Sequence, residues 1–184
     1  MSVSATPKRI TIEQWKRDWA TRDERYELVY GVATLAPTED YRNLNATARL
    51  IALFVNALDS LRWWFAPHGG VTLREGTRPT VRIPDFAVVR RTEEEGHLRR
   101  AGDVAVVVEV VSPSSKRTDR IVKRREYASA RISAYLIVEV LGEKPHLTLL
   151  TNPSGQDYAT ETAGHTLTLH VDGQDITVHA LDLT

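Results

Sequence analysis

The clearest periodic pattern in the chain lies between residues 41 and 61, where apolar side chains recur every three or four positions. The recurring residues are Leu44, Ala48, Ile51, Val55 and Leu58. This spacing gathers the apolar side chains on one face and predicts an amphipathic helix. A shorter helix is predicted over residues 11–20, where Thr11 and Gln14 have the spacing of a capping box.

Two almost wholly apolar runs, 104–111 and 134–141, predict strands that are covered on both faces. Each run carries a single acid, Glu109 in the first and Glu139 in the second. Residues 118–131 between them predict a helix. The order strand, helix, strand therefore predicts a right-handed crossover that leaves the two strands parallel.

Shorter segments rich in β-forming residues fill much of the remaining chain. They are 25–36, broken at Gly31; 62–66 and 71–74, around a turn at 67–70; 80–89, interrupted at Pro84; and 147–151, 166–171 and 176–179. Asp172 and Gly173 have the sequence of a hairpin turn. Residues 90–102 are charged and lack strong periodicity, so we expect a loop or a short helix. The predicted class is α/β, with a central mixed sheet flanked by helices.

Length and composition restrict the class of protein. The 184 residues fit one domain, and 42% hydrophobic with 26% charged residues is the balance of a soluble globular protein. Without cysteine, the chain has no disulfide, thiolate metal site or cysteine nucleophile. No apolar run is long enough to span a membrane, and residues 1–9 are polar, unlike a secretory signal. We therefore expect a cytoplasmic protein without membrane contact.

Glu109 is the most informative single residue, because its neighbours on both sides are valines. Burying an unpaired carboxylate costs several kcal/mol, so something must neutralise it. One interpretation is a structural ion pair with an arginine of the following helix. The other, which we favour, is a metal ligand near the carboxyl end of the strand, where α/β sheets usually place their sites.

Asp85 follows Pro84 in the segment 80–89. Because proline cannot donate to a sheet ladder, the strand is locally bent there and the Asp85 side chain can leave the pleat. An aspartate after proline is also an ordinary turn residue. Asp85 becomes a candidate metal ligand because of its pairing with Glu109. Two carboxylates on adjacent strands repel one another unless a cation lies between them, and Mg²⁺ prefers such oxygen ligands.

The segment 114–131 is the only marked basic cluster in a chain whose formal net charge is zero. It holds Lys116, Arg117, Arg120, Lys123, Arg124, Arg125 and Arg131. A solvated helix face is the simple interpretation for most of them. Phosphate binding is the alternative for some, and any nucleic-acid binding must use such a local patch. Glu27 lies in a predicted strand, where an exposed acid is common, and the six histidines show no metal-ligand spacing.

Taken together, these segments resemble the Uma-two family of restriction-endonuclease-type proteins, within the P-D-(D/E)-x-K nuclease superfamily. The resemblance runs from about residue 25 to about residue 178. The segments that carry it are RYELVYG (25–31), IPD (83–85), VVEVVSPS (107–114), KRREYA (123–128) and YLIV (135–138). Each piece is short, and it is the ordered set with this spacing that is specific.

The resemblance implies a restriction-endonuclease-like core and a set of site residues. Asp85 and Glu109 would hold a divalent metal, Mg²⁺ or Mn²⁺, with the Val110 carbonyl as a further ligand. The superfamily lysine usually lies two residues after the glutamate, where this chain has Val111. The family resembles those in which the lysine has moved to the following helix, which points to Lys123.

Glu27 matches an acidic position of the first strand and would orient Lys123 or a metal-bound water. The chain departs from the family pattern at Tyr30 and Val32, which replace acids around a glycine, and at Asn43, which replaces a histidine. The acids Asp85 and Glu109 are retained, so we expect a working site.

We therefore expect a single restriction-endonuclease-like domain over 1–184. It would comprise an N-terminal helical extension (1–24), a nuclease core (25–151) and a C-terminal β-hairpin region (152–184). The expected activity is that of a Mg²⁺-dependent endodeoxyribonuclease with DNA as substrate, acting as a homodimer. The expected nucleic-acid contacts are Lys116, Arg117, Arg120 and Arg124. Two alternatives stay open: a non-catalytic nucleic-acid-binding module with the same fold, and a structural partner protein whose acids only pair with arginines.

Overall fold

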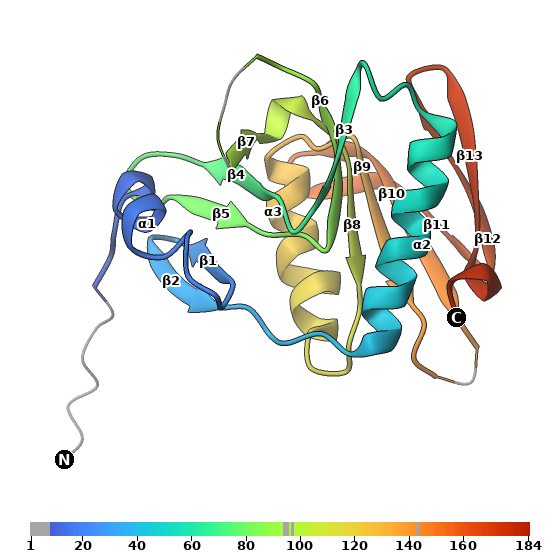
Figure 1. Cartoon of the computed structure of the whole chain (residues 1–184), viewed down its shortest axis with the longest axis horizontal. Coiled ribbons are helices and arrows are strands. Elements are labelled where there is room, and N and C mark those ends of the chain that lie inside the picture. Colours follow the sequence, from blue (N-terminus) through green and yellow to red (C-terminus); the bar gives the residue numbers. More distant parts are fainter. Residues whose placement is uncertain (1–7, 94–95, 97, 143) are drawn as a thin grey trace.

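A six-stranded sheet forms the centre of the molecule, with α2 (Tyr41–Ala57) on one face and α3 (Arg124–Ser129) on the other (Figure 1). The computed structural model describes residues 8–93, 96, 98–142 and 144–184, so most of the polar start of the chain lies outside the described residues. In spatial order the strands are β11 (Asp157–Gly164), β10 (His146–Ser154), β9 (Ala134–Glu139), β8 (Val104–Val110), β6 (Phe86–Arg90) and β3 (Trp63–Pro67). The mixed α/β class with a central sheet is confirmed.

The alternation of side chains along β8 explains the two-sided core. Val106 and Val108 pack into the cluster that contains Leu50 and Phe54 of α2. Val107 belongs to the opposite cluster, which contains Tyr127 and Ala128 of α3. Successive side chains of a strand point to opposite faces, so Glu109 must point to the α3 side.

The predicted parallel pairing of β8 with β9 is present, and the helical segment between them covers the sheet. This segment begins with a π-helical stretch, η2 (Thr118–Lys123), which continues directly into α3. A π-helical turn inside a helical segment is rare and is frequently found at functional sites. The sequence pattern predicts a helix over 118–131 but does not reveal this change of winding.

A second sheet of five strands lies beside the first (Figure 1). Its strands in spatial order are β2 (Val32–Leu35), β1 (Tyr26–Val29), β5 (Thr80–Arg82), β4 (Gly70–Arg74) and β7 (Leu98–Arg100). The helix α1 (Ile12–Asp18) begins at Thr11 with the predicted capping box and packs Trp15 against Leu28 and Val81. β1 and β2 form the hairpin predicted around Gly31.

Two of the points at which the chain passes from one sheet to the other are adjacent. One lies between β3 and β4, at His68 and Gly69, and the other between β5 and β6, at Pro84 and Asp85. The His68 N–H donates to the Asp85 carbonyl at 3.3 Å, which ties the crossings together. A Cβ on Gly69 would lie 2.8 Å from the Cβ of Ala66, so the turn needs a glycine. Asp85 thus stands at the seam between the sheets.

Three features of the fold correct or extend the sequence expectations. The segment 90–102, for which the sequence predicts a loop or a short helix, contains β7, which pairs in parallel with β4, followed by the short η1 (Ala101–Asp103). The sequence pattern does not predict β11, because most of its side chains are exposed and it pairs through its backbone with β10. β10 itself continues past position 152, the expected start of the C-terminal region.

The remaining C-terminal residues form the hairpin β12 (Thr166–Val171) and β13 (Gln174–His179), followed by η3 (Ala180–Leu183). The hairpin turns at Asp172 and Gly173, as predicted, with positive φ angles of 53° and 79°. Its apolar side chains join the same core cluster as α2. Among the described residues, no helix has both the length and the apolar character needed to cross a membrane.

Candidate active site

Glu109 is almost completely buried, with 2% of its surface exposed, in the cluster of valines that the sequence indicated. One of its oxygens, Oε1, contacts Lys123 Nζ at 2.8 Å and accepts the hydroxyl proton of Tyr127 at 2.6 Å. Within the described residues, Oε2 has no hydrogen-bond donor. Glu109 lines a cavity of about 220 Å³, so this second oxygen is the one left for a ligand.

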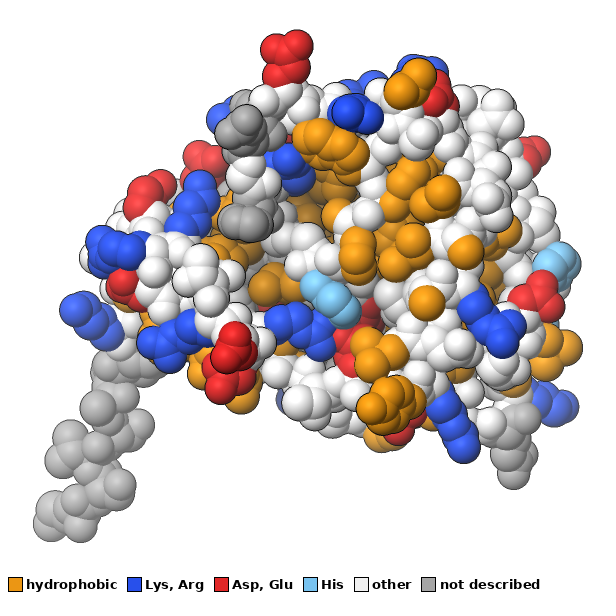
Figure 2. All heavy atoms as spheres, in the orientation of Figure 1, with side chains coloured by type: hydrophobic (Ala, Val, Ile, Leu, Met, Phe, Trp, Pro, Cys, Tyr) orange, Lys and Arg blue, Asp and Glu red, His pale blue; other side chains and the backbone are white. Residues whose placement is uncertain are grey.

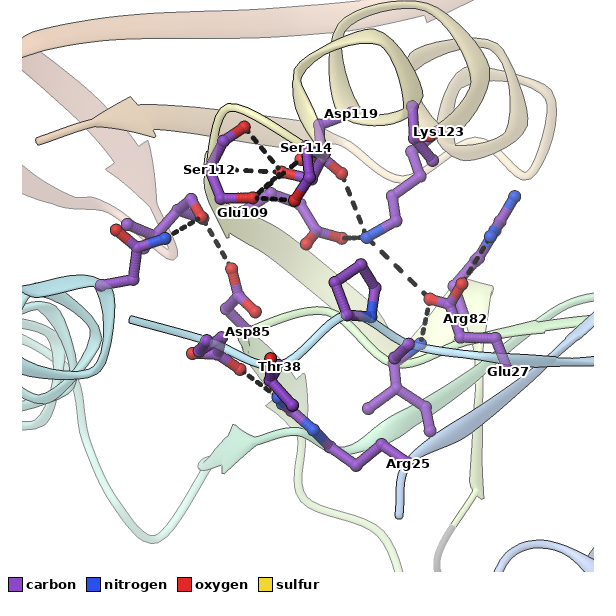
Figure 3. A pocket seen from close by; sticks show the side chains of 18 of the residues that line it. Arg25, Glu27, Thr38, Arg82, Asp85, Glu109, Ser112, Ser114, Asp119 and Lys123 are labelled. Carbon is purple, nitrogen blue, oxygen red and sulfur yellow. Dashed lines mark hydrogen bonds and ion pairs between the residues drawn. The ribbon is translucent and has the colours of Figure 1, made fainter. Parts of the chain in front are cut away.

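Lys123 lies in η2 and contacts three carboxylates with one ammonium group. Its Nζ lies 2.8 Å from Glu109, 3.2 Å from Asp119 and 3.9 Å from Glu27. Burial alone would lower the pKa of Lys123, but these carboxylates outweigh it and raise the pKa above its ordinary value. Lys123 therefore stays protonated and holds a fixed positive charge at the edge of the cavity (Figure 3).

Asp85 enters the same cavity from the seam between the sheets (Figure 3). Its Oδ2 accepts the backbone N–H of Val110 at 2.7 Å, which links the Asp85 segment to the end of β8. Burial and the nearby Glu39 carboxylate raise the pKa of Asp85 to about 7, against the opposing effects of the Val110 N–H and Lys123. Burial likewise raises the pKa of Glu109, and Asp85 adds to this, whereas Lys123 opposes it.

Val110 is held from both sides. Besides its N–H bond to Asp85, its carbonyl oxygen accepts a hydrogen bond from Asn43 Nδ2 at 3.1 Å. The Oδ1 of Asn43 is buried and has no hydrogen-bond partner in the described part of the chain. A carbonyl oxygen has two lone pairs, so the Val110 carbonyl keeps one for a further ligand.

Glu27 is not the exposed strand acid that its local sequence suggested, because only 7% of its surface is exposed. Its Oε2 contacts Arg82 Nη1 at 2.5 Å, and its Oε1 accepts the backbone N–H of Ile83 at 3.2 Å. Arg82 also binds Glu126 through Nε at 2.6 Å and Nη2 at 3.0 Å. The acid is thus fixed between β5 and α3 and faces Lys123.

The donor atoms fit a divalent cation. Asp85 and Glu109 each use one carboxylate oxygen for a protein contact, and neither has a hydrogen-bond donor on the other oxygen within the described residues. The carboxylates lie in one cavity, and the pKa of each is raised, as expected for acids that lack full compensation. Carboxylate and carbonyl oxygens are the ligands preferred by Mg²⁺ and also suit Mn²⁺.

The basic residues of the segment 114–131 differ in their surroundings, because some pair with acids and others are exposed. Lys116 and Arg120 both contact Glu139, at 3.4 Å and 2.5 Å, and Arg117 is exposed. Arg124 pairs with two exposed acids, Asp157 and Glu161. On the face shown in Figure 2, Lys and Arg side chains are interspersed with Asp and Glu, and no continuous basic surface is visible there.

Three further residues belong to the site but were not identified from the sequence. Asp119 and Tyr127 lie four residues before and after Lys123, a spacing that places helical side chains near one another and could have indicated both. Arg82 lies in a strand in which all three residues are buried, and a buried arginine always needs a partner. Its partners Glu27 and Glu126 come from distant segments, so only the fold reveals them.

Comparison with known proteins identifies a family and a similar solved structure. The family Uma2, described as "Putative restriction endonuclease", matches residues 11–180. A solved structure described as a "putative nuclease belonging to DUF820 from Anabaena variabilis ATCC 29413" is similar, with a TM-score of 0.73 and 12% identity. That similarity covers 95% of this chain and 97% of the other. No protein with a curated description matches the sequence. Since the match spans nearly the whole chain, the protein belongs to the Uma2 family.

Proposed function

We propose that the protein is a metal-dependent endonuclease that hydrolyses phosphodiester bonds in DNA. The observation that carries this proposal is the arrangement of Asp85 and Glu109 in one cavity, with Lys123 held against Glu109. A buried acid in a valine strand is costly unless a positive charge compensates it, and a bound cation would add to the compensation that Lys123 provides. Family membership supports the nuclease class, and the oxygen donors support the metal dependence.

In this proposal Asp85, Glu109 and the Val110 carbonyl hold the cation. Bound there, Mg²⁺ or Mn²⁺ would lower the pKa of a coordinated water and neutralise charge on the phosphate oxygens. Lys123 places a fixed positive charge 2.8 Å from Glu109, where it stabilises charge that develops on the phosphate. Glu27 keeps Lys123 in place from the opposite side, 3.9 Å away, and is itself anchored by Arg82.

DNA would reach the cavity along the helical segment that carries Lys123. We propose phosphate contacts from four basic residues of this segment, Lys116, Arg117, Arg120 and Arg124. Because the chain has zero net charge, binding relies on this local group rather than on a general basic surface. Nucleases that cut both strands are often two-fold dimers, so we propose a homodimer, which sedimentation analysis of the free protein would test.

The test is cleavage of a plasmid with Mg²⁺ or Mn²⁺, with EDTA as the metal-free condition. Glu109→Gln keeps an acceptor for Tyr127 while removing the charge, so we expect loss of cleavage by at least about 100-fold, the scale seen when a catalytic group is removed. Glu13→Gln makes the same chemical change on the exposed face of α1 and should leave cleavage unchanged.

Cleavage by wild type in EDTA would contradict the proposal. So would a Glu109→Gln variant that cleaves normally. DNA binding that weakens steeply with salt, without cleavage in any divalent cation, would instead support the non-catalytic binding module.

A further inference from the structure

A histidine and two acids from three separate segments meet beside the proposed nuclease centre. Glu39 lies just before α2, His68 lies at the crossing from β3 to β4, and Asp85 lies at the crossing from β5 to β6. One potential ligand atom of each lies within 4.8 Å of the others. We propose that Glu39, His68 and Asp85 form a second cation site, which binds a transition-metal dication such as Mn²⁺ when Arg25 moves aside.

Glu39 provides the strongest independent indication of a missing ligand. Its side chain is 10% exposed. Its Oε1 is contacted by Arg25 and lies 3.7 Å from His68 Nδ1, whereas its buried Oε2 has no hydrogen-bond partner in the described part of the chain. Buried carboxylate oxygens are almost always satisfied by donors or by a cation. Like charges on Glu39 and Asp85 at this separation also repel one another unless a positive charge lies between them.

Arg25 now supplies that positive charge. Its Nη2 lies 2.5 Å from Glu39 Oε1, and its Nη1 contacts His68 Nδ1 directly. Figure 3 shows Arg25 on the same side of the cavity as Asp85. The Arg25 side chain is 29% exposed, so it borders solvent. Arg25 therefore acts as a cation in the position that a metal ion would take.

The backbone keeps His68 in place for this role. Its φ angle is 53°, a left-handed conformation that side chains rarely adopt and that histidine, asparagine and aspartate tolerate best. Gly69 cannot be replaced without a clash, and the His68 N–H is bonded to the Asp85 carbonyl. The φ angle, Gly69 and the N–H hydrogen bond thus fix the backbone from which the imidazole projects.

The ligand chemistry separates this site from the first one. Asp85, Glu109 and Val110 offer only oxygen atoms, whereas the second site adds an imidazole nitrogen. Imidazole with carboxylates favours Mn²⁺, Co²⁺ or Zn²⁺ over Mg²⁺. The second site shares Asp85 with the proposed nuclease centre but does not depend on Glu109, so the two can be tested separately.

The experiment is Mn²⁺ binding to the full chain, with stoichiometry from calorimetry and the imidazole ligand detected by pulsed electron paramagnetic resonance. Wild type should bind two Mn²⁺ and show a nitrogen coupling. Asparagine tolerates the left-handed φ, so His68→Asn should keep the turn but lose one Mn²⁺ and the nitrogen coupling. Glu109→Gln should keep the coupling. His170→Ala is the matched control, because His170 also contacts a carboxylate, that of Asp175, but on the exposed hairpin.

Arg25→Gln should change the Mn²⁺ affinity in the opposite direction. Removal of the competing guanidinium should tighten Mn²⁺ binding at this site by about tenfold or more, corresponding to at least about 1.4 kcal/mol. A purely structural role for Arg25 predicts unchanged or weaker binding, which would overturn the proposal. A saturated wild type without nitrogen coupling, or a coupling that survives in His68→Asn, would also overturn it. Mn²⁺ that binds without the coupling and is lost in Glu109→Gln would leave the nuclease proposal intact and eliminate this one.

Discussion

Tyr127 donates its hydroxyl proton at 2.6 Å to the same oxygen of Glu109 that Lys123 contacts. This arrangement assigns the two Glu109 oxygens different roles. Oε1 is held by the protein, and Oε2, which has no hydrogen-bond donor among the described residues, is left for a ligand. The Tyr127 ring is completely buried and packs edge-on against Tyr135, so its hydroxyl has little freedom to turn away.

Tyr127→Phe should therefore reduce cleavage without removing any proposed catalytic residue. We expect a loss of about tenfold in rate and of about 1 kcal/mol in unfolding free energy, the usual value of one buried hydrogen bond. Tyr158→Phe is the matched control, because its hydroxyl donates at 3.0 Å to the Ile132 carbonyl, away from the cavity. The control should lose similar stability and no activity. Equal rates for the two variants would show that Tyr127 does not position Glu109.

Lys123→Met should destabilise the fold as well as abolish cleavage. It leaves Glu109, Asp119 and Glu27 without the cation that they share, and removing one partner of a buried ion pair costs about 3–5 kcal/mol. Urea unfolding at pH 8 measures the loss. The control, Lys116→Met, removes a lysine whose side chain is 62% exposed and should cost no more than about 1 kcal/mol.

Arg82→Lys should not behave as a conservative change. The guanidinium makes two contacts with Glu126 and one with Glu27, a geometry that a single ammonium cannot reproduce. We expect the free energy of unfolding, measured in urea, to fall by about 1–3 kcal/mol. We also expect slower cleavage, because Glu27 loses its anchor. Arg124→Lys, whose partners Asp157 and Glu161 are exposed, should change stability by less than about 1 kcal/mol. Equal losses would contradict the assigned role of Arg82.

The raised pKa of Asp85 predicts how stability depends on pH. Without metal, the folded state holds this proton up to about pH 7, whereas the ordinary value is 3.8, so the folded state binds more protons in between. Stability of the metal-free protein should therefore fall as pH rises through this range. A bound cation reverses the effect, because it needs the ionised carboxylate.

The Mn²⁺-induced rise in melting temperature should accordingly be larger at pH 8 than at pH 5.5. Thermal unfolding with and without Mn²⁺ at both values measures it. In Asp85→Asn the difference between the two pH values should shrink. A rise that is equal at both pH values in wild type would contradict the assignment of Asp85 as a ligand.

The strand β8 shows how far sequence can lead. Its valine run predicts burial on both faces, and this pattern alone indicates that Glu109 needs a neutralising partner. Lys123 is predicted by the resemblance to the family and not by the helix pattern, because periodicity does not say which side of the helix faces the acids. Local pattern is enough for Glu109, and the resemblance adds Lys123.

The rest of the site depends on contacts between distant segments. Arg25, Glu39 and His68 have no common motif, and they meet only because the chain passes repeatedly between two sheets. The sequence around Glu27 predicts an exposed strand acid. The structure instead pairs β1 with β5, and this pairing places Glu27 against Arg82. Periodicity describes one element at a time, so it cannot predict such meetings.

The central claim is that one divalent cation binds to both Asp85 and Glu109. The most direct test is a crystal of wild type soaked in Mn²⁺, examined by anomalous scattering. We expect an anomalous peak bonded to a carboxylate oxygen of each residue, and no such peak in Glu109→Gln. A crystal that contains Mn²⁺ elsewhere but none between these carboxylates, from protein that cleaves DNA with Mn²⁺, would contradict it.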